Sequence, residues 1–194
     1  MPDIFTKFSS YKYGLIASLK DLDQQLDKIQ AFADAIESTT KAGGTIYVAG
    51  NGGSAAIADH LVCDVCKGVG HNSDLTPRVV SLVSNVPMLT AIGNDIGYDQ
   101  TFSYYFDKLT NNAEDLLIAI SSSGNSPNIL RLLEKAEDIG VRSVALVGFN
   151  GGAALKLADI AIHIEAYNYG IVEDMHQAIM HLVSQYLAEK HACH

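Results

Sequence analysis

Five short apolar runs recur along the chain, and each is separated from the next by a longer stretch with helical periodicity. A strand that is covered on both faces reads as a nearly continuous apolar run, and strands that alternate with helices form parallel sheets. The sequence therefore predicts an α/β fold with a five-stranded parallel sheet flanked by helices. The runs lie at 46–49, 79–83, 116–120, 144–147 and 160–164.

The 194 residues are expected to form a single domain, because no linker, repeat or change of composition divides them. Before the first run, apolar residues at steps of three and four define one stripe of a long helix that ends at Gly43 and Gly44. A helix this long cannot bury its whole stripe on its own sheet, so residues 1–42 are expected to form an extension used in oligomerisation. A last helix is predicted at 172–190. The N-terminal stripe consists of Leu15, Leu19, Leu22, Leu26, Ile29, Phe32 and Ile36.

Charge and composition argue against several classes of protein. The formal net charge is −9 and no run of Lys or Arg occurs, so a nucleic-acid-binding protein is not expected. No apolar stretch reaches the ~20 residues of a membrane-spanning helix, and the N-terminus lacks the basic and apolar regions of a secretory signal.

Three cysteines cannot pair completely, so we expect a protein of the reducing cytoplasm. Cys63 and Cys66 form one Cys-x-x-Cys pair, whereas a zinc ribbon needs two, and we interpret them as buried helix cysteines. His191 and His194 are expected to lie at a frayed chain end.

A glycine-rich loop, Gly50-Asn51-Gly52-Gly53-Ser54, follows the first predicted strand. Glycine allows positive φ and lets a ligand approach the backbone, while Ser54 could cap the next helix and offer its hydroxyl to an anion. The alternative is a tight strand-to-helix turn without a ligand.

A serine-rich loop, Ser121-Ser122-Ser123-Gly124-Asn125-Ser126, follows the third predicted strand and precedes Pro127. Proline suits the first helical position, with Ser126 as the N-cap. A capped turn needs only one serine, so the additional hydroxyl groups favour a phosphate-binding site without a cationic side chain. Both loops follow strand ends, where open parallel sheets bind ligands.

Two predicted helices carry candidate metal ligands. His60 and Asp64 lie four residues apart, on one side of the helix that follows the first loop. They could hold a divalent metal, or they could be a polar histidine and a solvated carboxylate. On the last helix, Glu173 and His181 diverge by roughly 80° around the axis and could still meet at one site.

The two loops resemble the signatures of the sugar isomerase (SIS) fold, GNGGS after the first strand and SSSGNS after a later one. Within that fold the chain is similar to the phosphoheptose isomerases, which are tetramers with sites at subunit boundaries. Their Asn-Asp pair, which contacts sugar hydroxyls, matches Asn94 and Asp95, in a segment (91–98) that by itself reads as a loop. The resemblance implies that a phosphosugar is bound by Asn51, Gly52, Gly53, Ser54, Asn94, Asp95, Ser121, Ser122, Ser123, Ser126 and Glu173.

The resemblance also implies one zinc ion per subunit, or manganese, iron or nickel in its place. The implied ligands are His60, Asp64, Glu173 and His181, with Asp64 as the catalytic base and His181 as the acid. The family has glutamate where Asp64 stands, so the shorter aspartate requires a closer backbone. It has glutamine where Glu173 stands, and the added negative charge favours a dication. Because metal binding lowers the basicity of a carboxylate, the alternatives for the base are a free oxygen of Asp64 or another residue such as Asp95.

The resemblance implies the isomerisation of sedoheptulose 7-phosphate to D-glycero-D-manno-heptose 7-phosphate, for heptose synthesis in surface polysaccharide. The reaction would be a metal-assisted proton transfer between ketose and aldose through an enediol. Two alternatives stay open. One is an isomerase of another phosphosugar, and the other is a non-catalytic SIS regulator similar to the replication-initiation regulators.

Overall fold

The computed structural model describes residues 3–110 and 113–192 and contains five parallel strands in one sheet, as predicted. The chain passes from the first strand to a neighbour on one side, and then returns to the other side. This reversal lies between β1 and β3, and open parallel sheets bind ligands at the carboxyl ends of such a pair. The spatial order is β2-β1-β3-β4-β5, with β1 at Thr45–Gly50, β2 at Arg78–Ser81, β3 at Leu116–Ser121, β4 at Arg142–Val147 and β5 at Ile160–His163.

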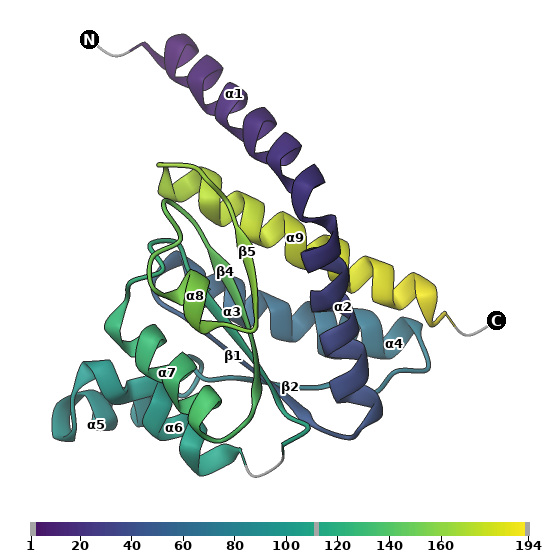
Figure 1. Cartoon of the computed structure of the whole chain (residues 1–194), viewed down its shortest axis with the longest axis vertical. Helices are drawn as coiled ribbons and strands as arrows, with labels where there is room; N and C mark the ends of the chain where they lie inside the picture. The colour runs from purple at the N-terminus through teal and green to yellow at the C-terminus, as the bar shows by residue number, and fades with distance from the viewer. Residues whose placement is uncertain (1–2, 111–112, 193–194) are drawn as a thin grey trace.

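Helices cover both faces of the sheet and give the domain three layers (Figure 1). One face carries α2 (Leu26–Lys41), α3 (Gly53–Val62), the π-helical η2 (Cys63–Val69) and α9 (Tyr169–Lys190), with the short α4 (Gly70–Asn72) next to η2. The other face carries α6 (Thr101–Leu109), α7 (Pro127–Asp138) and α8 (Ala154–Leu157), with α5 (Val86–Asp95) and η3 (Tyr98–Gln100) beside α6.

The strands are apolar on both sides because each side meets a helix layer. In β1, Ile46 and Val48 pack in one cluster with Phe32 of α2. Tyr47 points to the opposite face, where its ring lies 5.1 Å from that of Phe106. Each large side chain buried in this way stabilises the fold by about 1.5–3 kcal/mol. This two-sided burial accounts for the continuous apolar runs of the sequence.

The predicted N-terminal helix is present but interrupted. α1 (Ile4–Leu22) is followed by a single 3-10 turn, η1 (Asp23–Gln25), before α2 begins. α2 packs on the sheet, whereas α1 extends away from the domain and contacts α9 (Figure 1). There the hydroxyl of Tyr11 donates a hydrogen bond to the carboxylate of Asp174. Within the described residues, no helix is long and apolar enough to cross a bilayer.

Gln25, the last residue of η1, binds the backbone of the edge strand β5. Its Nε2 donates to the carbonyl oxygen of His163 at 2.7 Å, and its Oε1 accepts from the amide of His163 at 2.9 Å. A further strand would otherwise make these two hydrogen bonds to this residue. The backbone of Gln25 has φ −122°, outside the helical range, which accounts for the break between α1 and α2.

Candidate active site

The glycine loop places the N-terminus of α3 at the carboxyl end of β1. Gly52 is the N-cap residue, and its φ of +56° is one that L side chains rarely adopt. Ser54 lies inside the first turn, where it is buried, so the expectation that it caps the helix is wrong. Its hydroxyl and the free amides of this helix end are instead positioned to bind an anion.

The serine loop occupies the same position after β3, and α7 begins at Pro127 as predicted. Ser126 holds the N-cap position, but its side chain makes no capping bond. It accepts a hydrogen bond of 3.5 Å from Ser121 Oγ. Ser122 Oγ is buried without a hydrogen-bond partner among the described residues. Because α7 does not use these hydroxyls, they are available to a ligand.

A third loop, at residues 148–153 after β4, and the first residue of α8 support the serine loop through their backbone. The amide of Gly148 donates to the carbonyl of Ser122 at 2.9 Å, and the amide of Ala154 donates to that of Gly124 at 3.0 Å. These bonds fix the main chain of the serine loop without using its hydroxyl groups.

Asn51 joins the glycine loop to α7. Its Nδ2 donates to Asn128 Oδ1 at 2.8 Å, and Asn128 Nδ2 donates back to Asn51 Oδ1 at 2.9 Å. The hydroxyl of Tyr98 donates to the same oxygen of Asn51 at 2.9 Å. Neither Asn128 nor Tyr98 was predicted from the sequence as a partner of Asn51. Asn128 directly follows Pro127, so its place in the first turn of α7, next to the serine loop, could have been predicted. No comparable position in the sequence marks Tyr98.

The two loops and the start of α9 enclose a cavity of about 120 Å³, called the serine pocket below. None of the residues that line it carries a positive charge, so an anion would be held by hydroxyl groups and helix-end amides. A side chain at Gly53 would collide with the carboxylate of Glu173, which therefore lies against the first turn of α3. The lining residues are Asn51, Ser54, Ile120, Ser121, Ser122, Ser123, Ser126, Tyr169 and Glu173.

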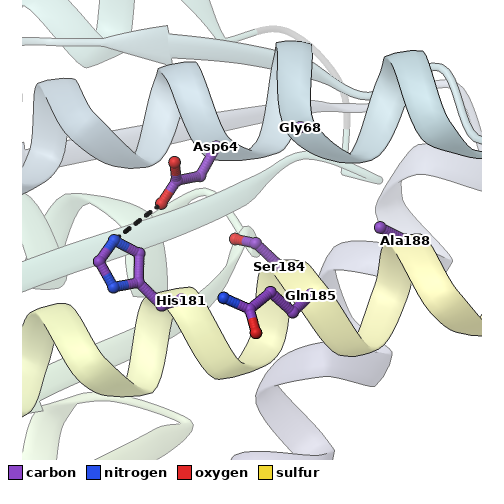
Figure 2. Close-up of a pocket in the computed structure, with 6 residues that line it drawn as sticks. All are labelled: Asp64, Gly68, His181, Ser184, Gln185 and Ala188. Atoms are coloured by element: carbon purple, nitrogen blue, oxygen red, sulfur yellow. Dashed lines mark ion pairs between the residues drawn. The ribbon is translucent and has the colours of Figure 1, made fainter.

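Two histidines and an aspartate meet farther along the same helices. His60 Nε2 lies 3.2 Å from Asp64 Oδ1, and His181 Nε2 lies 3.5 Å from Asp64 Oδ2. Figure 2 shows the Asp64 side chain pointing across to His181 on α9. Asp64 belongs to the π-helical η2, a wider helix type that is frequent at functional sites. We call these three residues the triad.

The triad fits a divalent metal. One donor atom from each side chain lies within 4.8 Å of the other two. Asp64 Oδ2 is buried and accepts no hydrogen bond from the described residues, which is costly unless a cation faces it. Two imidazoles and a carboxylate are donors that zinc takes. Asp64 and His181 line a second cavity, of about 160 Å³, together with Gly68, Ser184, Gln185 and Ala188 (Figure 2).

The remaining predicted site residues lie elsewhere. Glu173 lines the serine pocket, eight residues or about 12 Å before His181 along α9. Asn94 and Asp95 end α5, so the expectation of a loop at this point is wrong. Both are exposed, Asn94 Nδ2 donates to Asp95 Oδ1 at 2.7 Å, and neither lines the serine pocket.

His176 lies between Glu173 and His181 in sequence, but its side chain faces the core. It is fully buried, and this burial lowers the pKa of its imidazole to about 4. The ring is therefore neutral at pH 7 and serves packing rather than the site.

Two expectations about reactive side chains are wrong. Cys63 and Cys66 are exposed rather than buried, because η2 turns them away from the core. His191 is the C-cap residue of α9 and is held by ion pairs, so this end is not frayed. Cys193 and His194 lie outside the described residues.

Known proteins resemble this chain over nearly its whole length. Residues 10–148 match the family model of the SIS domain. A phosphoheptose isomerase of Akkermansia muciniphila is 36% identical over 174 residues, which cover 89% of this chain and 90% of that protein. One of Helicobacter pylori (strain P12) is 32% identical over 196 residues, covering 97% and 95%. A phosphoheptose isomerase structure from Francisella tularensis aligns with a TM-score of 0.88 at 28% identity, covering 97% of this chain and all of that one (100%).

Proposed function

Because the chain belongs to the SIS domain family and to its phosphoheptose isomerases, we propose that it converts sedoheptulose 7-phosphate into D-glycero-D-manno-heptose 7-phosphate. It is thus an enzyme, an aldose–ketose isomerase. The observation that carries the proposal is the pairing of the serine pocket with the triad, since α3 and α9 contribute to both.

The serine pocket binds the phosphate group. Ser122 Oγ, which is buried without a partner among the described residues, and Ser54 at the start of α3 donate to its oxygens. The amides at the ends of α3 and α7 add a positive potential. Hydroxyls and amides thereby take the place of the cationic side chains that the pocket lacks.

The triad moves the proton. Asp64 removes a proton from C1 of the ketose and returns it to C2, while His181 exchanges protons with the oxygens on these two carbons. His60, Asp64 and His181 would hold a divalent metal, which we propose to be zinc, and its positive charge would stabilise the enediolate.

The proposed assembly is a homotetramer with sites at subunit interfaces, in which residues 1–42 supply contacts. Its support is the apolar surface of α1 that a single chain leaves exposed. We place the protein in the cytoplasm, in heptose synthesis for surface polysaccharide.

The direct test is turnover of sedoheptulose 7-phosphate by the purified protein, with and without a chelator. We expect turnover that is lost on chelation and restored by zinc. Replacing Asp64→Asn should lower kcat by at least about 100-fold, the usual contribution of a positioned base. Asp138→Asn, on the exposed end of α7, is the control and should keep the kcat of the unaltered chain.

A second candidate substrate is another phosphosugar, because Asp64 and Glu173 both change the chemistry of the site relative to the family pattern. A panel of five-, six- and seven-carbon sugar phosphates separates the two candidates. Undiminished turnover in Asp64→Asn would show that this carboxylate is not the base.

A further inference from the structure

One stripe of α9 carries three side chains that can bind ligands. Glu173, Gln177 and His181 follow one another at steps of four, so they lie on the same side of the helix. All three are half-buried, in contrast to the fully buried His176 of the core-facing side. α3 packs against α9. The stripe begins where α9 meets Gly53 of α3 and ends at the triad.

The first residue of the stripe is engaged at the serine pocket. The Glu173 carboxylate lies against Gly53, at the positive end of the α3 dipole. His181 lies about 12 Å farther along the helix axis. The glutamate is therefore held at the phosphate-binding end of the site rather than at the triad.

The middle residue of the stripe reaches the triad directly. Gln177 Nε2 lies 2.8 Å from His181 Nε2, the same imidazole nitrogen that faces Asp64 Oδ2. A half-turn of the terminal amide exchanges its nitrogen and its oxygen, so Oε1 can occupy the same place. A neutral amide oxygen is thus available beside the His181 imidazole nitrogen, which itself faces the Asp64 carboxylate.

We propose that Gln177 completes the metal-binding set with His60, Asp64 and His181, and that Glu173 belongs to the substrate pocket. The amide ligand of this chain would then lie one helical turn later than the residue that the family resemblance implies. Four donors satisfy zinc, and this set carries one negative charge instead of two. The proposal rests on the metal site of the proposed function.

The test compares two variants of the full-length protein by competition between the protein and a zinc-binding dye. Gln177→Leu, which removes the amide, should weaken zinc binding by at least about tenfold, as loss of a ligand or of its immediate partner does. Glu173→Ala, which removes the carboxylate four residues earlier on the same stripe, should keep zinc affinity within about threefold. Thermal unfolding of the chelated proteins checks that both variants are folded.

Binding of inorganic phosphate tests the other half of the proposal, that Glu173 belongs to the substrate pocket. Glu173→Ala removes a negative charge from the serine pocket and should tighten phosphate binding severalfold, whereas Gln177→Leu should leave it unchanged. Neither measurement needs turnover. An inactive protein with this double pattern would therefore count against the proposed reaction while supporting the ligand assignment.

Tenfold weaker zinc binding in Glu173→Ala would overturn the assignment, and so would unchanged zinc binding in Gln177→Leu. If the leucine variant does not fold, Gln177→Glu serves in its place. A carboxylate in contact with the metal should tighten zinc binding, and an unchanged affinity would count against the proposal.

Discussion

Phe149 adopts a strained backbone conformation beside the serine pocket. Its φ of +50° lies in the left-handed region, which costs about 1–2 kcal/mol for a side chain of this kind. Its carbonyl oxygen accepts a hydrogen bond from His163 Nε2 at 2.9 Å, and its ring centroid lies 4.7 Å from that of Tyr169. The strained residue therefore packs against Tyr169, which lines the serine pocket and is 60% exposed.

Replacing Tyr169→Ala should raise KM for sedoheptulose 7-phosphate about fivefold with less than a twofold change in kcat, because the ring offers an apolar face to the carbon chain of the substrate. Tyr169→Phe should keep the original KM, since the ring and not the hydroxyl makes this contact. Steady-state kinetics with the folded variants measures both values.

Tyr167→Ala is the control for this prediction. Its ring centroid lies 5.8 Å from that of Phe149, but the residue does not line the serine pocket. Its removal leaves the contact between Phe149 and Tyr169 in place, so KM should stay within about twofold. A Tyr169→Ala variant with an unchanged KM would show that the ring does not touch the substrate.

The site residues that could be predicted from the sequence are those that belong to short local motifs. The glycine and serine loops and the spacing of His60 and Asp64 are local, and the structure brings all three features to α3 and its surroundings. Tyr98 and Tyr169 were missed because their contacts join distant parts of the chain. The pocket position of Glu173 follows from the close approach of α3 and α9, which spacing along one helix does not reveal.

Glu37 connects two helices that lie far apart in sequence. Its carboxylate pairs with Lys41 of its own helix, with Lys190 at the end of α9, and with His191 Nε2 at 3.1 Å. Hydrogen bonds from Lys190 and Lys41 lower the pKa of Glu37 to about 2, although its burial acts in the opposite direction. His191 also lies 3.2 Å from the carboxylate of Asp74, so this cluster fixes the end of α9.

Replacing Glu37→Gln should lower the free energy of unfolding by about 1 kcal/mol at pH 7, a modest value because the lysines are partly exposed. A carboxylate whose pKa is depressed on folding stabilises the protein above its unfolded pKa of 4.5, and loses that effect as the pH falls toward 2. The difference between the two proteins should therefore shrink across this window, as measured by urea unfolding.

Glu134→Gln, on the exposed side of α7, is the matched control for charge removal. It should change the unfolding free energy by less than about 0.5 kcal/mol at either pH. A stability difference for Glu37→Gln that stayed constant down to pH 2 would show that the ion pairs do not cause it.

At the scale of elements, apolar periodicity predicted the strands and the last helix within a few residues. It did not predict the break at η1, because Leu22 and Leu26 continue the same apolar stripe through it. The break depends on the contact between Gln25 and β5, which is a tertiary interaction. Tertiary interactions also explain why a loop was predicted at Asn94 and Asp95. Their side chains favour turns, but the surrounding fold stabilises the helix that they end.

The whole molecule exposes more apolar surface on α1 than a stable single chain usually does. Phe5 is 78% exposed and Phe8 is 62% exposed. A contiguous apolar surface of this kind marks a protein interface. Further exposed residues of the same helix are Ile4, Tyr13, Ile16 and Leu19.

The double replacement Phe5→Ser and Phe8→Ser should reduce the mass of the assembly below that of a tetramer, because α1 then lacks the apolar surface that partner subunits bury. Light scattering after size exclusion measures the mass. Lys7→Ser, on the same helix, is the control and should leave it unchanged. A double variant with the original mass would mean that α1 is not an interface element.

At the scale of the fold, the class of sheet was predictable but the order of its strands was not. Continuous apolar runs report that a strand is covered on both faces, and they carry no information about which strand lies beside it. The reversal of direction between β1 and β3, which brings the two loops together, was visible only in the structure.

The contact between Gln25 and the edge strand β5 affects how copies of this chain can associate. A free strand edge is a template on which other chains can extend a sheet, with aggregation as the result. The side chain of Gln25 occupies the donor and the acceptor of His163 at the last residue of β5. Growth of the sheet past that residue is blocked at this edge, and loss of this amide would favour fibre-like association.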